Sequence, residues 1–250
     1  MESKKREAPP AESGETGSMT MIDRQGQDRI ARELDERGWA VLPGLLDAET
    51  CGTFAALYDA EEGFRKRVVM ERHGYGRGEY RYFAYPLPPL VDRLRNGLYP
   101  HLVPIANGWQ ERMGREVRFP ADHGEFLDRC HMAGQVRPTP LLLRYGTGDY
   151  NCLHQDIYGE HVFPLQAAVL LSRPGKDFEG GEFVLTEQRP RMQSRAEVVP
   201  LGQGDAVVFA VAGRPRAGRR GHHGVTMRHG VATLRAGHRH VLGIIFHDAA

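Results

Sequence analysis

Cysteine, net charge and long apolar segments are all scarce in this sequence of 250 residues. Its three cysteines are odd in number and show no Cys-x-x-Cys spacing, which argues against a disulfide framework or a thiolate zinc cluster. No segment approaches the roughly 18 to 20 apolar residues of a membrane-spanning helix, and no apolar stretch follows the charged N-terminus as in an export signal. We therefore expect a cytoplasmic protein without a membrane partner.

The formal net charge is only +1, so nothing draws the whole molecule toward nucleic acid. The charge is unevenly placed, however, because residues 189–239 contain ten arginines and only two acidic residues, a local net charge of +8. Segments 189–195 and 214–220 hold most of these arginines. Three interpretations stay open for them: solvated loops, a surface that follows nucleic-acid phosphates, or a binding surface for an acidic protein or small molecule.

The chain divides by composition into three parts. Residues 1–18 are rich in Pro, Gly, Ser and charge, and predict a disordered tail. Residues 19–250 are long enough to bury an independent core, and we expect them to form a single domain. Its N-terminal part, 19–135, has mainly helical patterning, whereas 136–250 consists of short strand-like runs separated by Gly, Pro and Asp.

Helical spacing of apolar residues predicts four helices and, between the first two, one short strand at 39–42. The helices are expected over 23–37, from a cap at Asp47 to Tyr58, over 90–102 with breaks near Pro100 and Pro104, and over 125–132. Later strands are expected at 141–145, 166–171, 182–186, 198–201, 206–211, 225–233 and 240–246. This order predicts an α+β fold in which N-terminal helices pack on one face of a β jelly roll.

One short motif carries metal-binding chemistry. His154-Gln155-Asp156 follows the expected strand 141–145 and a glycine-rich turn. Alternate residues of an extended chain share one side, so the imidazole and the carboxylate can reach one ion. Two histidines and one carboxylate on one side of an ion leave its other positions open, which is the arrangement of non-haem iron(II) oxygenases. Such a site requires one further histidine.

His229 is our candidate for that histidine, and Arg239 lies ten residues later, where its guanidinium can bind a carboxylate. A three-residue hairpin loop at 235–237, with Gly237 in the left-handed conformation, would place Thr233 opposite Arg239 and His229 opposite Gly243. Both functional side chains would then point to one face. A two-residue loop would put them on opposite faces.

Other histidines compete for the same role. His223-Gly-Val imitates His229-Gly-Val, so His222 and His223 are rivals for the distal ligand. We favour His229 because its spacing to Arg239 fits one hairpin. His123-Gly-Glu125 is a second triplet of metal-ligand type, but it precedes a helical stretch and is interpreted as structural.

In combination, these motifs resemble the 2-oxoglutarate and iron(II)-dependent oxygenases, with a core of the prolyl 4-hydroxylase type over about residues 140–248. The resemblance is carried by the segments 145–156, 180–183, 204–209 and 229–239. More closely, Arg-Pro-Thr-Pro-Leu-Leu-Leu-Arg (137–144), Asn-Cys-Leu-His-Gln-Asp (151–156), Arg-Pro-Arg-Met-Gln-Ser-Arg (189–195) and Ile-Ile-Phe-His-Asp (244–248) are similar to a bacterial subfamily predicted to modify nucleic acid or repair it oxidatively.

The resemblance implies a role for each motif residue. His154, Asp156 and His229 would bind Fe(II), and Arg239 would hold the far carboxylate of the cosubstrate 2-oxoglutarate. Tyr145 would donate a hydrogen bond to that carboxylate, with Thr233 assisting. The implied reaction uses O2, hydroxylates a C–H bond of an unknown primary substrate and releases succinate and CO2.

Several alternatives remain beside this expectation. The primary substrate could be a protein, a small molecule or alkylated nucleic acid, the last by oxidative demethylation. A jelly roll can also bind metal without turnover, and Tyr145 could simply be a buried core tyrosine. Residues 74–85 are rich in Gly and Tyr and are expected to form a mobile loop able to act as a lid.

Overall fold

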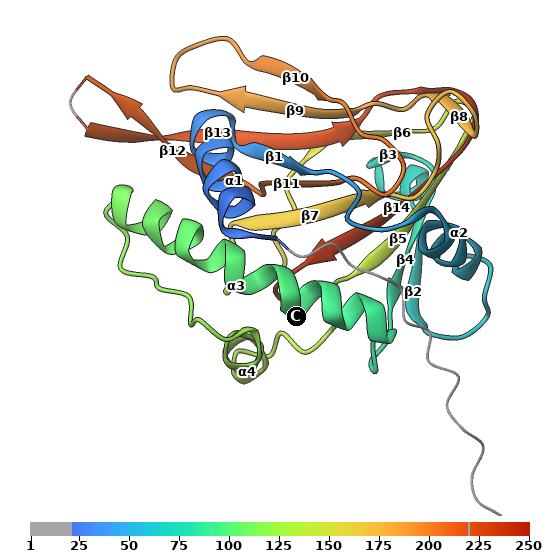
Figure 1. Cartoon of the computed structure of the whole chain (residues 1–250), viewed down its shortest axis with the longest axis horizontal. Coiled ribbons are helices and arrows are strands. Elements are labelled where there is room, and N and C mark those ends of the chain that lie inside the picture. The colour runs from blue at the N-terminus through green and yellow to red at the C-terminus, as the bar shows by residue number, and fades with distance from the viewer. Residues whose placement is uncertain (1–21, 220) are drawn as a thin grey trace, which may run out of the picture.

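Two antiparallel β-sheets and a set of helices surround the region where the sequence motifs meet (Figure 1). The computed structural model describes residues 22–219 and 221–250, and the expected tail at 1–18 lies outside them. The predicted α+β jelly roll with helices on one face is confirmed. None of the helices in the described ranges combines the length and apolarity needed to cross a lipid bilayer.

The larger sheet has eight strands. Its order is β1 (Trp39–Leu42), β11 (Ala206–Ala210), β7 (Leu165–Leu170), β14 (Leu234–Ile245), β5 (Leu141–Gly146), β4 (Glu79–Phe83) and β2 (Phe64–Val69), with β8 (Phe178–Gly180) also paired to β14. The smaller sheet has six strands. Its order is β10 (Arg195–Val199), β9 (Phe183–Gln188), β13 (Gly221–Val231), β6 (Tyr150–His154) and β3 (Gly76–Arg77), with β12 (Gly213–Gly218) paired to β13.

Successive side chains along the strands of the larger sheet point to opposite faces, and each face packs into its own hydrophobic core. On β11, Val207 and Phe209 face a cluster shared with the smaller sheet, whereas Val208 faces a second cluster shared with the helices. Both faces of the larger sheet are therefore covered, which explains why β7 is buried at every position and is apolar apart from Gln166. The space between the two sheets holds the candidate site.

The helices cover the outer face of the larger sheet, with α3 running along it (Figure 1). They are α1 (Arg24–Arg37), α2 (Ala48–Leu57), α3 (Pro89–Arg112) and α4 (His123–Met132), and a 3-10 turn, η1 (Met70–His73), precedes β3. The Asp23 side chain caps α1 by accepting from the Gly26 amide, and Asp47 caps α2 by accepting from the Thr50 amide. Both helix starts are as the sequence predicts.

The predicted break of the third helix is wrong, because α3 continues through Pro100 and Pro104. Each interior proline removes one backbone hydrogen bond and costs about 3 kcal/mol. Buried residues along the whole helix, with Leu98 before the two prolines, Leu102 between them and Trp109 after them, anchor it to the core. Burial of such side chains contributes about 1.5–3 kcal/mol each, which offsets the cost of the prolines.

The expected mobile loop over residues 74–85 is also corrected. Residues 79–83 form β4, an interior strand of the larger sheet between β5 and β2, and Tyr82 and Phe83 are buried there. The two ends of the segment lie at the surface, with Tyr75 and Tyr85 each about half exposed. The sequence signal was misleading because the glycines of this segment, Gly74, Gly76 and Gly78, all sit in left-handed backbone next to the strands rather than in one long loop.

The predicted hairpin between residues 225 and 246 does not form. β13 pairs with β6, β9 and β12 in the smaller sheet, whereas β14 pairs with β5, β7 and β8. Only Ala232 and Thr233 join the two strands, so the chain passes from one sheet to the other at this point. Gly237 is left-handed as expected, but it lies within β14 beside β8. The register that places Thr233 opposite Arg239 is therefore wrong.

Candidate active site between the two sheets

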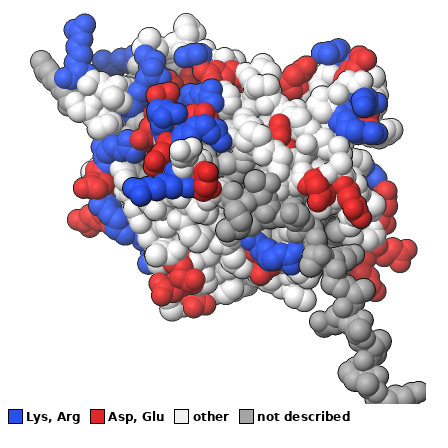
Figure 2. Space-filling view, viewed as in Figure 1, with Lys and Arg blue, Asp and Glu red and all other residues white. Residues whose placement is uncertain are grey.

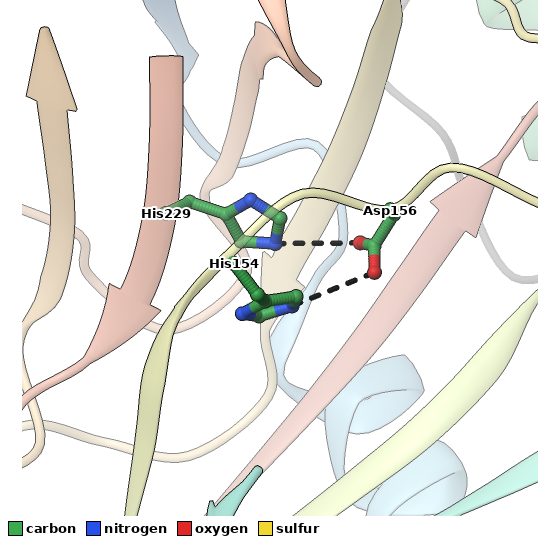
Figure 3. Close-up of side chains that lie close together, drawn as sticks. All are labelled: His154, Asp156 and His229. Atoms are coloured by element: carbon green, nitrogen blue, oxygen red, sulfur yellow. Dashed lines mark ion pairs between the residues drawn. The ribbon is translucent and has the colours of Figure 1, made fainter. Parts of the chain in front are cut away.

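His154, Asp156 and His229 come together between the sheets (Figure 3). One candidate ligand atom from each lies within 4.8 Å of the others. Asp156 Oδ1 is 3.5 Å from His154 Nε2, and its Oδ2 is 3.3 Å from His229 Nε2. His154 is the last residue of β6 and His229 lies opposite it on β13, so strand pairing brings the two rings to one place.

The geometry of the His-x-Asp triplet is fixed by hydrogen bonds to backbone carbonyls. His154 Nδ1 lies 2.7 Å from the Cys152 carbonyl oxygen. Since a carbonyl can only accept, Nδ1 carries a proton, which leaves Nε2, the nitrogen facing Asp156, as the ring atom able to bind a metal. Gln155 donates from Nε2 to the carbonyl oxygens of Ala212 and Met227, which holds the chain between the two candidate ligands.

His229 depends on a close approach of β13 and β6. The next residue is Gly230, and a Cβ there would lie only 2.6 Å from the Asn151 carbonyl oxygen. Any larger residue would push the strands apart at the point where the two histidines face each other. The His229 ring also packs against Phe209, with centroids 4.6 Å apart. The close packing of β13 against β6 therefore explains why a glycine follows His229 in the sequence.

Burial and pairing shift the pKa values of the three groups in different directions. Burial alone would raise the pKa of Asp156, but hydrogen bonds from both imidazoles hold it well below its ordinary value. Burial acting alone would lower the pKa of His154, but the hydrogen bond between this ring and Asp156 raises it. The pKa of the more deeply buried His229 stays lowered by burial. An ionised carboxylate beside a neutral imidazole is a suitable donor set for a divalent cation.

A cavity of about 410 Å³ opens beside the triad, and Arg239 and Tyr145 also line it. Arg239 is 2% exposed, and its Nε and Nη1 atoms lack a hydrogen-bond partner among the described residues. Burial lowers the pKa of Arg239 to about 10, so the guanidinium stays charged at neutral pH. Tyr145, its neighbour across β5 and β14, is buried with a pKa raised to about 12 by burial. A buried cation with free donors is a receptor for an anion.

Arg239 faces the cavity together with Val241, Gly243 and Ile245, as alternation along β14 predicts. His229 and Val231 approach the same cavity from the opposite sheet. The sequence predicted that all these residues would lie on one face of a hairpin. They lie instead on two strands that face each other from different sheets. Thr233 is exposed in the crossing between the sheets and does not line the cavity.

The rival histidines lie elsewhere. His222 and His223 are exposed near the tip of the β12–β13 hairpin, with His223 opposite Arg216. His123 is buried at the start of α4, where its Nε2 lies 2.8 Å from the Phe246 carbonyl oxygen and its Nδ1 lies 2.7 Å from Asn96 Oδ1. Burial lowers the pKa of His123 to about 4, so this ring is neutral and structural.

Comparison with known proteins decides the class of the molecule. Residues 78–249 match the Oxygenase-NA family, described as oxygenases catalysing oxidative methylation of damaged DNA. The chain belongs to the Oxygenase-NA family. It is therefore an oxidoreductase, and the resemblance to 2-oxoglutarate and iron(II)-dependent oxygenases that the motifs indicate is confirmed.

Relatives of this oxygenase include both a close sequence and more distant structures. It is 50% identical over 191 residues to the uncharacterized protein MT2286 of Mycobacterium tuberculosis, covering 74% of this chain and 82% of that protein. It shares its fold with a Pseudomonas putida prolyl-4-hydroxylase at 15% identity and a TM-score of 0.50, covering 87% of this chain and 96% of the other. A Burkholderia pseudomallei oxidoreductase of the 2OG-Fe(II) oxygenase family gives 20% identity and a TM-score of 0.50, covering 94% and 98%.

Sequence reasoning missed two residues of the oxygenase that touch Asp156. The Tyr158 hydroxyl donates to Asp156 Oδ1 at 2.7 Å, and Gln166 Nε2 donates to Asp156 Oδ2 at 2.8 Å. Gln166 had a detectable signal, because it is the one polar residue in the otherwise apolar strand β7. A buried polar side chain in such a run requires a partner. Tyr158 lies outside regular structure, and nothing in the sequence marks it.

The arginine-rich segments of the oxygenase are less basic than their count indicates. Arg189, Arg214 and Arg216 all pair with Glu187, and Arg195 pairs with Glu197. Figure 2 shows blue and red side chains intermixed over the end of the molecule where α1, β12 and β13 lie. Two carboxylates thus offset two of these four positive charges, because three of the arginines share Glu187. Arg191, Arg219 and Arg228 are exposed.

Proposed function

We propose that this oxygenase binds Fe(II) through His154, Asp156 and His229 and uses 2-oxoglutarate and O2 to hydroxylate a C–H bond of its primary substrate. The observation that carries the proposal is the convergence of two imidazoles and one carboxylate beside a cavity. Such a set occupies one side of an ion and leaves room for exogenous ligands. Succinate and CO2 would be the products of the cosubstrate.

The cavity also fits the cosubstrate. Nε and Nη1 of Arg239 are buried donors that need an acceptor, and the far carboxylate of 2-oxoglutarate supplies two oxygens in the matching geometry. Tyr145 lies beside Arg239 and lines the same cavity, so its hydroxyl can donate to the same carboxylate. The volume of about 410 Å³ lies in the usual range for small-molecule sites.

Bound iron would supply the redox chemistry that links O2 to decarboxylation of the keto acid and to hydroxylation of the substrate. The protein's own residues orient and shield the reactants. Arg239 and Tyr145 would fix one end of the keto acid, and Phe183 and Phe209 form apolar wall beside His229. Exclusion of water by these walls favours reaction with the bound substrate.

We expect the Fe(II)-loaded protein, purified anaerobically, to release succinate from 2-oxoglutarate when O2 is admitted, even without a primary substrate. Asp156→Ala should reduce this release to background, because the variant lacks the only carboxylate of the triad. Asp128→Ala, at an exposed position on α4, is the control and should behave as the wild type. Iron and 2-oxoglutarate binding without any turnover in the wild type, substrate screens included, would instead indicate a non-catalytic binding module.

Oxidative demethylation of alkylated nucleic acid is the second candidate, favoured by the description of the family to which the chain belongs. Arg191, Arg219 and Arg228 provide exposed positive charge, and Tyr75 at the cavity offers an aromatic face for a base. Phosphate contacts and base stacking are the usual components of single-strand binding. The ion pairs of Glu187 and Glu197 reduce the charge available for this purpose.

If nucleic acid is the substrate, the protein should retard single-stranded DNA in a gel shift that weakens steeply between about 50 and 200 mM salt. The triple variant R191A/R219A/R228A should weaken binding and flatten the salt dependence by about one unit of slope per lost phosphate contact. Arg173→Ala, which removes an arginine already paired with Asp177, is the control. Absence of salt-sensitive binding in the wild type would leave protein and small-molecule substrates.

We place this reaction in the cytoplasm. Cys51, Cys130 and Cys152 are free thiols. Reduced cysteines are the norm in that compartment and uncommon in secreted proteins.

A further inference from the structure

Asp156 receives hydrogen bonds from two neutral donors in addition to the two histidines. The Tyr158 hydroxyl binds Oδ1 and the Gln166 amide binds Oδ2, at 2.7 and 2.8 Å. Each carboxylate oxygen therefore has one neutral donor of its own. Gln166 is 5% exposed and Asp156 8%, so bulk water does not compete effectively for these bonds.

The direction of both bonds is set by chemistry. An ionised carboxylate has no proton to give, so the phenol and the amide nitrogen must be the donors. The amide of Gln166 is thereby fixed with its nitrogen toward Asp156, and its Oε1 is left without a partner among the described residues. Tyr158 is fixed in turn, since the Tyr82 hydroxyl lies 3.3 Å from the Tyr158 hydroxyl.

The two donors connect Asp156 to the opposite sheet. His154 and His229 belong to the smaller sheet, but Gln166 lies on β7 and Tyr82 on β4, both in the larger sheet. Asp156 itself follows the end of β6 and belongs to neither sheet. The carboxylate is therefore held directly by Gln166 of the larger sheet and, through Tyr158, by Tyr82 of that sheet, while the histidines are held by strand pairing.

The hydrogen bonds from Tyr158 and Gln166 matter most when a metal ion is bound. A ring nitrogen that ligates a metal ion carries no proton, so neither imidazole can then donate to Asp156. Tyr158 and Gln166 are the donors that remain. We propose that Tyr158 and Gln166 are positioning residues that hold both oxygens of Asp156 in place for metal binding. The inference rests on the proposed function and extends it from the triad to its supporting side chains.

The test is anaerobic titration of the apoprotein with Co(II), followed by its absorption spectrum, for the wild type, Tyr158→Phe and Gln166→Leu. Loss of a hydrogen-bond partner of a metal ligand typically weakens metal binding about 10- to 100-fold, and we expect that loss in each variant. The spectrum of bound Co(II) should also change, because a carboxylate freed on one oxygen can alter its mode of coordination. Tyr150→Phe makes the same substitution at an exposed position on β6 outside the cavity, and its Co(II) affinity should stay within about threefold of the wild type.

A purely structural role would lower the thermal unfolding midpoint without moving the Co(II) affinity or spectrum of the folded protein. Unchanged Co(II) binding in both Tyr158→Phe and Gln166→Leu would overturn the inference and leave the proposed function standing. An equal loss in Tyr150→Phe would overturn it too, because the effect would then not depend on a hydrogen bond to Asp156. If the wild type itself bound no Co(II), the proposed function would fail and the inference with it.

Discussion

His229→Ala is expected to abolish both metal binding and succinate release. The substitution leaves one imidazole and one carboxylate, too few to hold a divalent ion on one side. The site cannot recruit a replacement easily, because the His229 ring is enclosed by Phe183 and Phe209 and no other described histidine lines the cavity except His154. Co(II) or Fe(II) binding by absorption and by metal analysis of the desalted protein measures the first effect, and a succinate assay the second.

His223→Ala is the matched control for this variant. The residue sits in the same sequence context, His-Gly-Val, but is exposed near the end of the β12–β13 hairpin. Metal content and turnover should remain at wild-type values. If His223→Ala lost metal binding and His229→Ala kept it, the distal ligand would be His223 and the assignment of His229 would be refuted. A circular dichroism spectrum of each variant shows that the comparison is made between folded proteins.

Arg239→Ala is expected to raise the KM for 2-oxoglutarate by about 100-fold or more while metal binding persists. Hydrogen bonds to charged groups contribute about 1.5–3 kcal/mol, and a bidentate pair lost at a buried site corresponds to at least two decades in affinity. The triad is untouched because the hydrogen bonds and ion pairs of His154, Asp156 and His229 do not involve Arg239. Steady-state succinate release against 2-oxoglutarate concentration gives KM, and Co(II) titration gives the metal affinity.

Arg235→Ala provides the control for a lost arginine on the same strand. Arg235 is exposed on β14 and lies 3.6 Å from Glu182, outside the active-site cavity. Its removal should leave the KM for 2-oxoglutarate within about twofold of the wild type, since exposed ion pairs contribute little. If Arg239→Ala had the same KM for 2-oxoglutarate as the wild type, the unpartnered guanidinium would have to bind a different ligand.

The fold was largely predictable wherever periodicity is strong. The strands after Pro140 alternate or run apolar between Gly and Pro signals, and most of them were located within a few residues. The strands within residues 64–83 were not, because they are rich in Arg, Tyr and Gly and are defined by their partners. β2 pairs with β4, β3 with β6, and β4 with β5. The continuity of α3 through two prolines was likewise decided by tertiary packing, which a local rule cannot weigh.

The candidate site was predictable from residue types, whereas its construction was not. The spacing from His229 to Arg239 looked like a hairpin, and the same two residues do face one cavity, but from opposite sheets. Sequence separation cannot distinguish these cases, because both place the side chains within reach of one another. Tyr158 and Gln166 escaped because hydrogen bonds to Asp156 depend on three-dimensional proximity between β7 and the chain after β6.

The two-residue crossing between β13 and β14 ties the two sheets together beside the active-site cavity. Backbone bonds hold both of its residues, since the Ala232 amide donates to the Glu182 carbonyl and the Thr233 carbonyl accepts from the Gly181 amide. His229 and Arg239 are thus tied together through a short, immobilised stretch of chain, and the sheets cannot slide past each other there. If Arg239 and the triad hold the two ends of 2-oxoglutarate as proposed, this tie between the sheets keeps the two anchors at a constant separation, and a shorter or longer keto acid should be a poorer cosubstrate.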